Sequence, residues 1–159
     1  MNVLIAYYHL GEITKVVDKF DSLFKKKKIN CIKFQANVKQ ELDLKKQFKI
    51  EKKLSLLNPI PQIKNFDLII IGTPIISFTS VPAINIFIRS LPELKNKKIV
   101  LFATGIGLSG NAIKKMSSLL SMKNANIIDF QVFSSIFEFD SKKMLEVEKF
   151  FKKFFEKIV

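Results

Sequence analysis

The sequence predicts an α/β protein in which helices cover both faces of a parallel sheet, a three-layer α/β/α sandwich. Apolar runs of strand length alternate along the chain with segments of helical periodicity. Several runs are apolar throughout, which is typical of strands buried on both faces. The 159 residues are enough for one domain with a substantial core. We therefore expect a single domain over residues 1–159, built on a five-stranded parallel sheet.

The first part of the chain predicts two strands separated by a helix. Residues 2–8 form a short apolar run, and the run at 30–35 follows as a second strand. Apolar residues recur at helical spacing over 14–27, and the lysines at 25–28 suit the negative end of a helix dipole. Residues 36–57 are charged and only weakly periodic, and two interpretations stay open: a helix that covers a face of the sheet, or an additional loop.

The rest of the chain predicts three further strands and three helices. The third strand is almost entirely apolar, and Thr73-Pro74 ends it. Pro82 stands in the first turn of the next helix, where a missing N–H costs little. A glycine-rich loop at 104–110 follows the fourth strand. The expected strands lie at 66–72, 98–103 and 125–133, and the expected helices at 81–90, 111–122 and 141–158.

The chain is strongly basic, with 27 lysines and arginines, 14 acidic residues and a formal net charge of +13. Such an excess favours nucleic acid or an anionic membrane as a partner. The basic residues are spread over both halves of the chain, however, and all but Arg89 are lysines. Specific readers of nucleic acid are mostly arginines. We therefore expect no nucleic-acid partner.

One uncharged stretch has the length of a membrane span, because residues 68–88 contain no charge over 21 positions. Gly72, Pro74 and Pro82 within it favour a strand, a loop and a helix instead. The N-terminal residues lack the basic region of a signal peptide. We expect a cytoplasmic protein without membrane insertion.

Cys31 and His9 are the only cysteine and the only histidine. They exclude an internal disulfide and make a metal site improbable on composition. A cysteine inside a strand is most often a small buried apolar group, and a lone loop histidine is most often solvated. With one histidine and no P-loop motif, hydrolase and nucleotide-triphosphatase functions are also disfavoured.

Three loops follow the ends of expected strands, at 9–13, 73–80 and 104–109. In open parallel sheets, ligands bind outside the carboxyl ends of the strands. The first loop leads into the start of a helix, where free N–H groups and the helix dipole favour a phosphate. Thr14 adds a hydroxyl group there. The three loops therefore predict one site at this edge of the sheet.

The sequence resembles the flavodoxin family over nearly its whole length. The resemblance rests on Val3-Leu4-Ile5-Ala6-Tyr7-Tyr8 followed by Thr14-Lys15, on Phe66-Asp67-Leu68-Ile69-Ile70-Ile71-Gly72-Thr73-Pro74-Ile75, and on Lys97-Lys98-Ile99-Val100-Leu101-Phe102-Ala103-Thr104-Gly105 with Ser109-Gly110-Asn111-Ala112. Of these, Gly72-Thr73-Pro74-Ile75 is the most specific match.

This resemblance implies the strand order 2-1-3-4-5 and an FMN cofactor. It implies that the first loop holds the FMN phosphate and that the second and third loops sandwich the isoalloxazine ring. The expected cofactor-binding residues are His9, Leu10, Gly11, Glu12, Ile13 and Thr14 in the first loop, Thr73, Pro74, Ile75, Ile76, Ser77 and Phe78 in the second, and Thr104, Gly105, Ile106 and Gly107 in the third.

The first loop departs from the family pattern, which is rich in serine, threonine and glycine. Only Gly11 and Thr14 match it, and the carboxylate of Glu12 is expected to repel a phosphate dianion. The second and third loops offer Ile76, Phe78, Ile106 and Leu108 to the ring, so Phe78 is the one aromatic candidate. Apolar walls disfavour an anionic reduced flavin and so predict a low potential for the last electron.

The leading functional hypothesis is an FMN-binding protein that carries electrons between redox partners. Its basic surface predicts acidic partners and an association that weakens as salt rises. A monomer or weak dimer is expected. Two alternatives stay open: a flavin-free binding or regulatory module with this fold, and an NAD(P)H-dependent FMN or quinone reductase. The glycines near Thr104 fit a nicotinamide fingerprint poorly.

Overall fold

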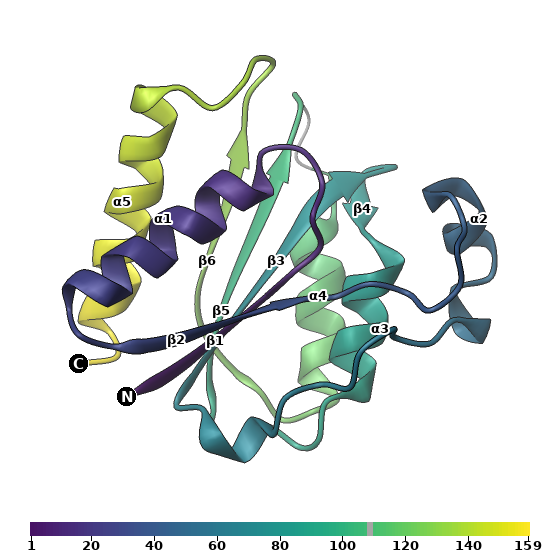
Figure 1. Ribbon diagram of the computed structural model, residues 1–159, viewed down its shortest axis with the longest axis horizontal. Helices are drawn as coiled ribbons and strands as arrows, with labels where there is room; N and C mark the ends of the chain where they lie inside the picture. Colours follow the sequence, from purple (N-terminus) through teal and green to yellow (C-terminus); the bar gives the residue numbers. More distant parts are fainter. Residues whose placement is uncertain (108–109) are drawn as a thin grey trace.

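The computed structural model describes residues 1–107 and 110–159. Its sheet consists of long parallel strands in the order β2-β1-β3-β5-β6, which confirms the predicted order 2-1-3-4-5 when the long strands are numbered along the chain (Figure 1). The short β4 (Thr79–Ser80) pairs antiparallel with β3. The long strands are β1 (Asn2–Tyr7), β2 (Asn30–Gln35), β3 (Leu68–Ile76), β5 (Lys98–Gly105) and β6 (Asn126–Ser134).

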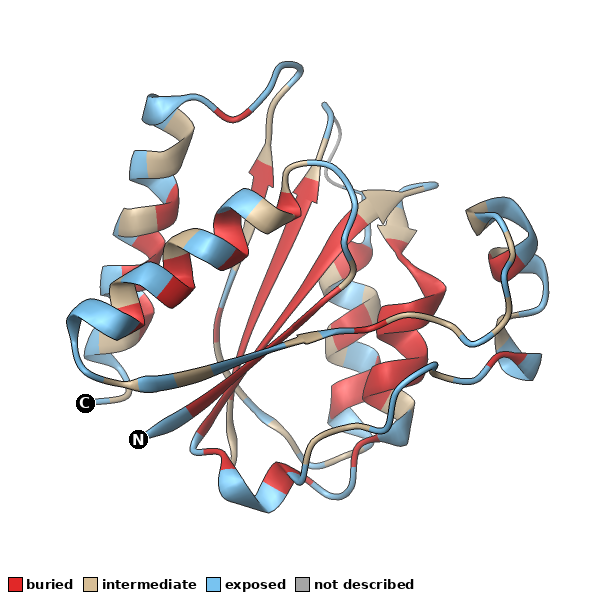
Figure 2. Ribbon diagram, in the orientation of Figure 1, coloured by how far each residue is buried: buried red, intermediate tan, exposed pale blue. Residues whose placement is uncertain are grey.

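Helices cover both faces of the sheet, as the apolar runs predict. On one face lie α1 (Ile13–Lys26) and α5 (Ser141–Glu156), and on the other lie α3 (Pro82–Ser90) and α4 (Ala112–Ser121) (Figure 1). Alternate residues of β1 enter opposite cores, because successive side chains of a strand point to opposite faces. Val3 therefore packs beneath α1, and Leu4 packs beneath α3. Figure 2 shows both buried layers.

The core under α1 and α5 is built largely from phenylalanine. Phe20 stands at its centre and is fully buried. Its ring meets Phe102 edge-on with centroids 5.5 Å apart, and Phe154 edge-on at 5.6 Å. Edge-to-face contacts of this kind add to the stabilisation from burial alone. The Phe102 ring also occupies the place that a Cβ atom at position 72 would take, so Gly72 is required by this packing.

Strand β3 continues to Ile76, so the expectation that Thr73-Pro74 ends it is wrong. Two pairings carry the strand on: Pro74 stays in register with Thr104 of β5, and Ile76 pairs with Thr79 of β4. Thr73 and Pro74 therefore belong to a strand, and the connection that follows is a tight hairpin at residues 77–78.

Residues 36–57 form a small excursion outside α3. It holds α2 (Leu44–Lys49), a short 3-10 turn (Glu51–Lys53) and a bridge between Val38 and Leu56. A carboxylate fastens it, because Glu51 accepts hydrogen bonds from Asn85 Nδ2 at 2.7 Å and Arg89 Nη1 at 2.6 Å. The weak periodicity of this segment did not predict α2, whose short amphipathic pattern is too brief to detect. A second 3-10 turn (Ile63–Asn65) precedes β3.

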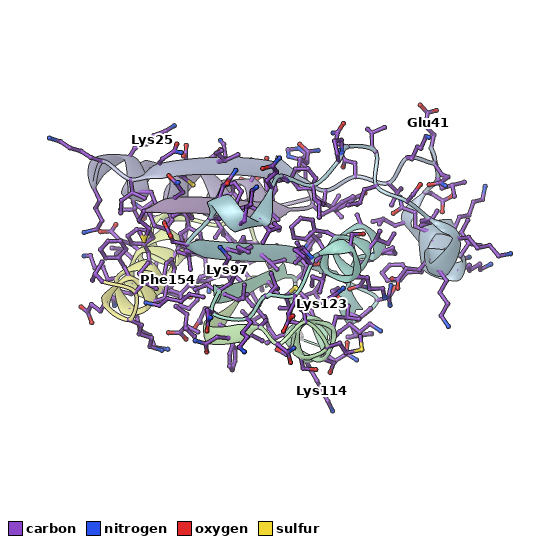
Figure 3. All side chains as sticks on the ribbon, turned by 90° about the horizontal axis from the view of Figure 1, so that it is seen from below. Lys25, Glu41, Lys97, Lys114, Lys123 and Phe154 are labelled. Atoms are coloured by element: carbon purple, nitrogen blue, oxygen red, sulfur yellow. The ribbon has the colours of Figure 1, made fainter. Side chains whose placement is uncertain are left out.

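Many lysines extend from the outer faces of the helices, as Lys25 and Lys114 do in Figure 3. Others bind main-chain carbonyl groups instead. Lys123 Nζ donates to the carbonyl of Arg89 at 2.8 Å, near the last turn of α3, and Lys97 Nζ donates to the carbonyl of Phe66 at 2.7 Å. A cation at a helix C-terminus satisfies its free carbonyl groups and complements its dipole. Part of the lysine excess therefore stabilises the fold.

The uncharged stretch at 68–88 is divided among β3, β4 and most of α3. This division confirms that a strand, a turn and a helix account for its apolar character. Within residues 1–107 and 110–159, no helix combines the length and the hydropathy needed to cross a bilayer.

Candidate functional site

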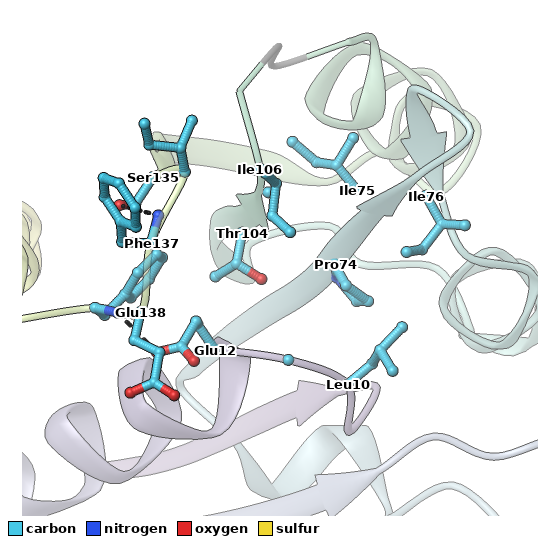
Figure 4. A pocket seen from close by; sticks show the side chains of 14 residues that line it. Leu10, Glu12, Pro74, Ile75, Ile76, Thr104, Ile106, Ser135, Phe137 and Glu138 are labelled. Atoms are coloured by element: carbon cyan, nitrogen blue, oxygen red, sulfur yellow. Dashed lines mark hydrogen bonds between the residues drawn. The ribbon is translucent and has the colours of Figure 1, made fainter.

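A pocket of about 410 Å³ opens at the carboxyl edge of the sheet, within the size range of small-molecule sites. Its walls come from the segment after β1, the carboxyl-terminal ends of β3 and β5 together with Ile106, and the segment after β6 (Figure 4). Three of these segments are those that the sequence predicts to meet. The predicted residues that line the pocket are Leu10, Gly11, Glu12, Pro74, Ile75, Ile76, Thr104, Gly105 and Ile106.

The start of α1 forms the floor of the pocket beside Gly11. Gly11 has a φ of +61°, a left-handed conformation that favours glycine, and a Cβ at this position would meet no atom within 4 Å. Glu12 stands at the N-cap, but its side chain forms no cap hydrogen bond. The N–H groups at the start of a helix lack partners four residues earlier, and they favour an anion. In α1 the N–H of Lys15 donates to the carbonyl of Glu12 at 3.1 Å. The local geometry thus suits a phosphate next to Gly11.

The Glu12 carboxylate, which is expected from the sequence to repel a phosphate, interacts with two donors. Its Oε2 accepts the main-chain N–H of Phe139 at 2.9 Å and lies 2.8 Å from Lys15 Nζ. The hydrogen bond from Lys15 lowers the pKa of Glu12, burial opposes this shift, and the Phe139 N–H lowers the pKa further. The Lys15 ammonium partly neutralises the carboxylate that lines the pocket.

Three predicted residues of the first loop do not line the pocket. His9 Nδ1 and Thr14 Oγ1 form a hydrogen bond of 2.9 Å with each other, so the two side chains brace the loop. His9 is exposed, in agreement with the expectation of a solvated side chain. Ile13 is fully buried in the core beneath α1. Their expected cofactor contact stays a prediction.

Thr73 is fully buried and has a local structural role. Its hydroxyl donates to the carbonyl of Pro74 at 2.9 Å and accepts the N–H of Val81 at 3.1 Å, just before α3. This pair of bonds ties the end of β3 to the start of α3. The hydroxyl is therefore already occupied within the protein.

Ser77 and Phe78 form the tip of the β3–β4 hairpin, with φ angles of +51° and +61°. Positive φ at both positions is the geometry of a type I′ turn, and it is strained for a phenylalanine. The carbonyl of Phe78 accepts the N–H of Asn111 at 2.7 Å, and a Cβ at Gly110 would overlap this carbonyl. The tip therefore faces a neighbouring hollow of about 580 Å³, beside Glu51, instead of the candidate pocket.

The third loop is only partly described. Ile106 lines the pocket and is largely exposed, while Gly107 has a φ of +73° and lies outside the lining. Leu108, which the sequence proposes as a ring contact, and Ser109 lie outside the described residues.

The sequence reasoning missed a fourth wall, formed by residues 135–139 after β6. The available signal was topological: every parallel strand ends at the same edge, so the segment after the last strand belongs to that edge as well. The three predicted loops follow only the first, third and fourth strands. Ile136 and Phe137, two large apolar residues in a short loop, were the side chains that could have drawn attention to this segment.

Among the described residues, no group of three or more histidine, cysteine or carboxylate side chains is placed to hold a metal ion.

Cys31 lies in β2 and is half-buried against the core under α1. Burial raises the pKa of its thiol to about 12, and the carboxylate of Asp21 raises it too. A thiol with this pKa is almost entirely protonated at neutral pH.

Cys31 is therefore expected to react slowly with iodoacetamide in the native protein. The thiolate is the nucleophile, and both burial and the raised pKa reduce its concentration at the surface. Mass spectrometry after timed alkylation measures the rate, and the same chain unfolded in guanidinium is the control. Equal rates in the native and unfolded protein would contradict the prediction.

No family profile and no curated protein matches the sequence. Solved structures do match. A Bacteroides eggerthii protein provisionally described as a flavoprotein is 19% identical, with a TM-score of 0.69, covering 99% of this chain and 97% of that one. A Streptococcus pneumoniae flavodoxin is 10% identical, with a TM-score of 0.68 and coverage of 99% and 100%. A Lactobacillus acidophilus flavoprotein in complex with FMN is 18% identical, with a TM-score of 0.61 and coverage of 92% and 98%.

These similarities extend over almost the full length of each chain and agree with the strand order and the two helical layers. At such low identities they establish architecture. The chemistry of the pocket has to be inferred from the residues that line it. The chain has a flavodoxin-like fold.

Proposed function

We propose that the protein binds FMN non-covalently and transfers electrons between redox partners. The observation that carries this proposal is the junction, within one pocket, of the α1 N-terminus with apolar walls from three strand ends. FMN presents the same two chemistries, a phosphate at one end and a flat ring system with broad apolar faces at the other. The similarity to a flavoprotein in complex with FMN supports the proposal.

The pocket fits this cofactor better at its apolar end than at its anionic end. Pro74, Ile75 and Ile106 provide apolar surface for a ring. At the phosphate end, side-chain hydroxyl donors are scarce, because Thr14 is bonded to His9. Main-chain N–H groups at the start of α1 and the open space at Gly11 take their place, while the Lys15 ammonium is paired with Glu12.

When bound, FMN supplies the redox chemistry by accepting and donating electrons. The residues of this chain bind and orient it. Gly11 permits close approach to the start of α1, and Ile75 and Ile106 exclude water from the ring. A low-dielectric wall disfavours added negative charge on the ring, so we infer a low reduction potential for the last electron.

Titration of the purified protein with FMN tests the proposal directly. Binding quenches the fluorescence of the free flavin, so a saturable loss at micromolar protein is the expected result. Fluorescence that is unchanged throughout the titration would contradict FMN binding and would support the flavin-free module. The specific observation that favours that module is the shortage of free hydroxyl donors in the first loop.

The Glu12→Gln variant is expected to bind FMN about fivefold more tightly, a gain of about 1 kcal/mol. Glutamine keeps an acceptor for the Phe139 N–H, removes one negative charge from the pocket lining and leaves the Lys15 ammonium free to attract the phosphate. Fluorescence titration at low ionic strength measures the change. The control is Glu148→Gln, which removes a carboxylate paired with Lys19 away from the pocket. Equal affinity in both variants would contradict the role of charge at Glu12.

The charge of the protein bears on its choice of partner. We infer an acidic redox partner, because the net charge of +13 attracts anionic surfaces and association through such charges weakens as salt rises. A single domain over 1–159, a cytoplasmic location and a monomer or weak dimer stay predictions. A reductase that uses NAD(P)H ranks lower. The glycines near Thr104 follow the fourth long strand, whereas a nicotinamide fingerprint is expected after the first strand.

A further inference from the structure

The segment after β6, residues 135–139, is a short loop fastened at both ends. At its start, the N–H of Ser135 donates to the carbonyl of Gly105 at 3.1 Å, which ties the loop to the end of β5. At its finish, the Phe139 side chain is almost fully buried in the core under α1. Inside the loop, the N–H of Phe137 donates to Ser135 Oγ at 3.2 Å. These contacts tie both ends of the loop to the body of the protein.

Glu12, at the start of α1, attaches to the end of this loop through a hydrogen bond. Its Oε2 accepts the Phe139 N–H at 2.9 Å, a bond between residues 127 positions apart in the sequence. A hydrogen bond to an ionised carboxylate is stronger than one between neutral groups. The pairing with Lys15 at 2.8 Å keeps this carboxylate ionised and oriented. The residue that departs most from the family pattern in the first loop thus forms a hydrogen bond with the segment after β6 (Figure 4).

The fastened loop presents apolar side chains that the protein itself leaves uncovered. Ile136 is 70% exposed and Phe137 is 77% exposed, and across the opening Ile106 is 81% exposed. All three line the same pocket. Clustered exposed apolar groups mark ligand or partner sites, because their contact with water is unfavourable. A loop tied at both ends with its apolar residues outward is suited to receive a flat ligand with apolar faces.

We propose that residues 135–139 form a fourth wall of the flavin pocket, in which Phe137 contacts the isoalloxazine ring and Glu12 positions the loop. This inference rests on the proposed function, since the ring is that of FMN. It assigns the aromatic contact to Phe137, because Phe78, the aromatic candidate from the sequence, faces the hollow beside Glu51. Phe137 is a binding residue in this proposal, and Glu12 is a positioning residue.

The first experiment compares FMN affinity in Phe137→Ala and Phe130→Ala. Phe130 is the matched control, because it lies in β6, is 57% exposed and does not line the pocket. Loss of a ring contact and its apolar burial should weaken FMN binding about tenfold in Phe137→Ala and leave Phe130→Ala unchanged. If the wild type binds FMN and the two variants bind equally well, the fourth wall is wrong while the proposed function stands.

The second experiment needs no flavin and tests the attachment at Glu12. Hydrogen exchange of the Phe139 amide should accelerate about tenfold or more in Glu12→Ala and stay slow in Glu12→Gln, which retains an acceptor. Glu148→Ala controls for the loss of a carboxylate elsewhere on the paired α1 and α5 surface. Equal exchange in Glu12→Ala and wild type would overturn the positioning role. If the wild type does not bind FMN, the proposed function and the Phe137 contact both fail, and the exchange result still decides the role of Glu12.

Discussion

The Gly11→Asp variant is expected to bind FMN about 30-fold more weakly than Gly11→Asn. The two side chains have the same shape and differ by one charge, so their comparison isolates electrostatics. Both residues tolerate the left-handed conformation that Gly11 adopts, and a Cβ there meets no neighbouring atom. Two unit charges about 5 Å apart repel by about 3 kcal/mol at an effective dielectric constant of about 20, and screening reduces this to about 2 kcal/mol.

Fluorescence titration measures the two affinities, and thermal unfolding of both variants shows whether the fold is equally stable. The difference between the variants should shrink as salt is added, because the repulsion is screened. Equal affinities of the aspartate and asparagine variants would show that the FMN phosphate does not lie beside Gly11. That result would contradict the anion site at the start of α1 and would leave the apolar end of the pocket untouched.

The Phe20→Ala variant is expected to lose about 3–5 kcal/mol of unfolding free energy. Phe20 is fully buried and contacts the rings of Phe102 and Phe154, so the substitution removes apolar burial and leaves a cavity between α1, the sheet and α5. Urea denaturation measures the loss. Phe130→Ala, which truncates an exposed phenylalanine on β6, should cost about 0.5 kcal/mol or less. Similar losses in both variants would contradict a central role for Phe20.

Periodicity was enough to predict the long elements, because buried strands and amphipathic helices leave repeating patterns. The apolar run that became β3 and the helical spacing that became α1 were both detectable in this way. The short helix α2 was not, because its six residues span less than two turns. The end of β3 was also missed, since pairing with β4 and β5 overrides the usual effect of Pro74.

The site was predictable to the extent that topology governs it. Strand ends in a parallel sheet share one edge, so the meeting of Leu10, Pro74 and Ile106 in one pocket followed from strand order. The individual roles did not follow. Phe78 and Thr73 lie in the predicted loop, yet the hairpin tip directs Phe78 elsewhere and two hydrogen bonds occupy the Thr73 hydroxyl. The direction of a side chain depends on contacts with residues distant in sequence.

The sequence by itself determined the α/β architecture, the strand order through its family resemblance, and the edge of the sheet where the pocket lies. Only the tertiary structure decided that Glu12 pairs with Lys15 and holds Phe139, and that a fourth segment completes the pocket. The physical reason is range. Burial patterns are visible in short stretches of sequence. The hydrogen-bond partner of a charged side chain depends on tertiary packing, and here the Glu12 carboxylate and the Phe139 N–H are 127 positions apart.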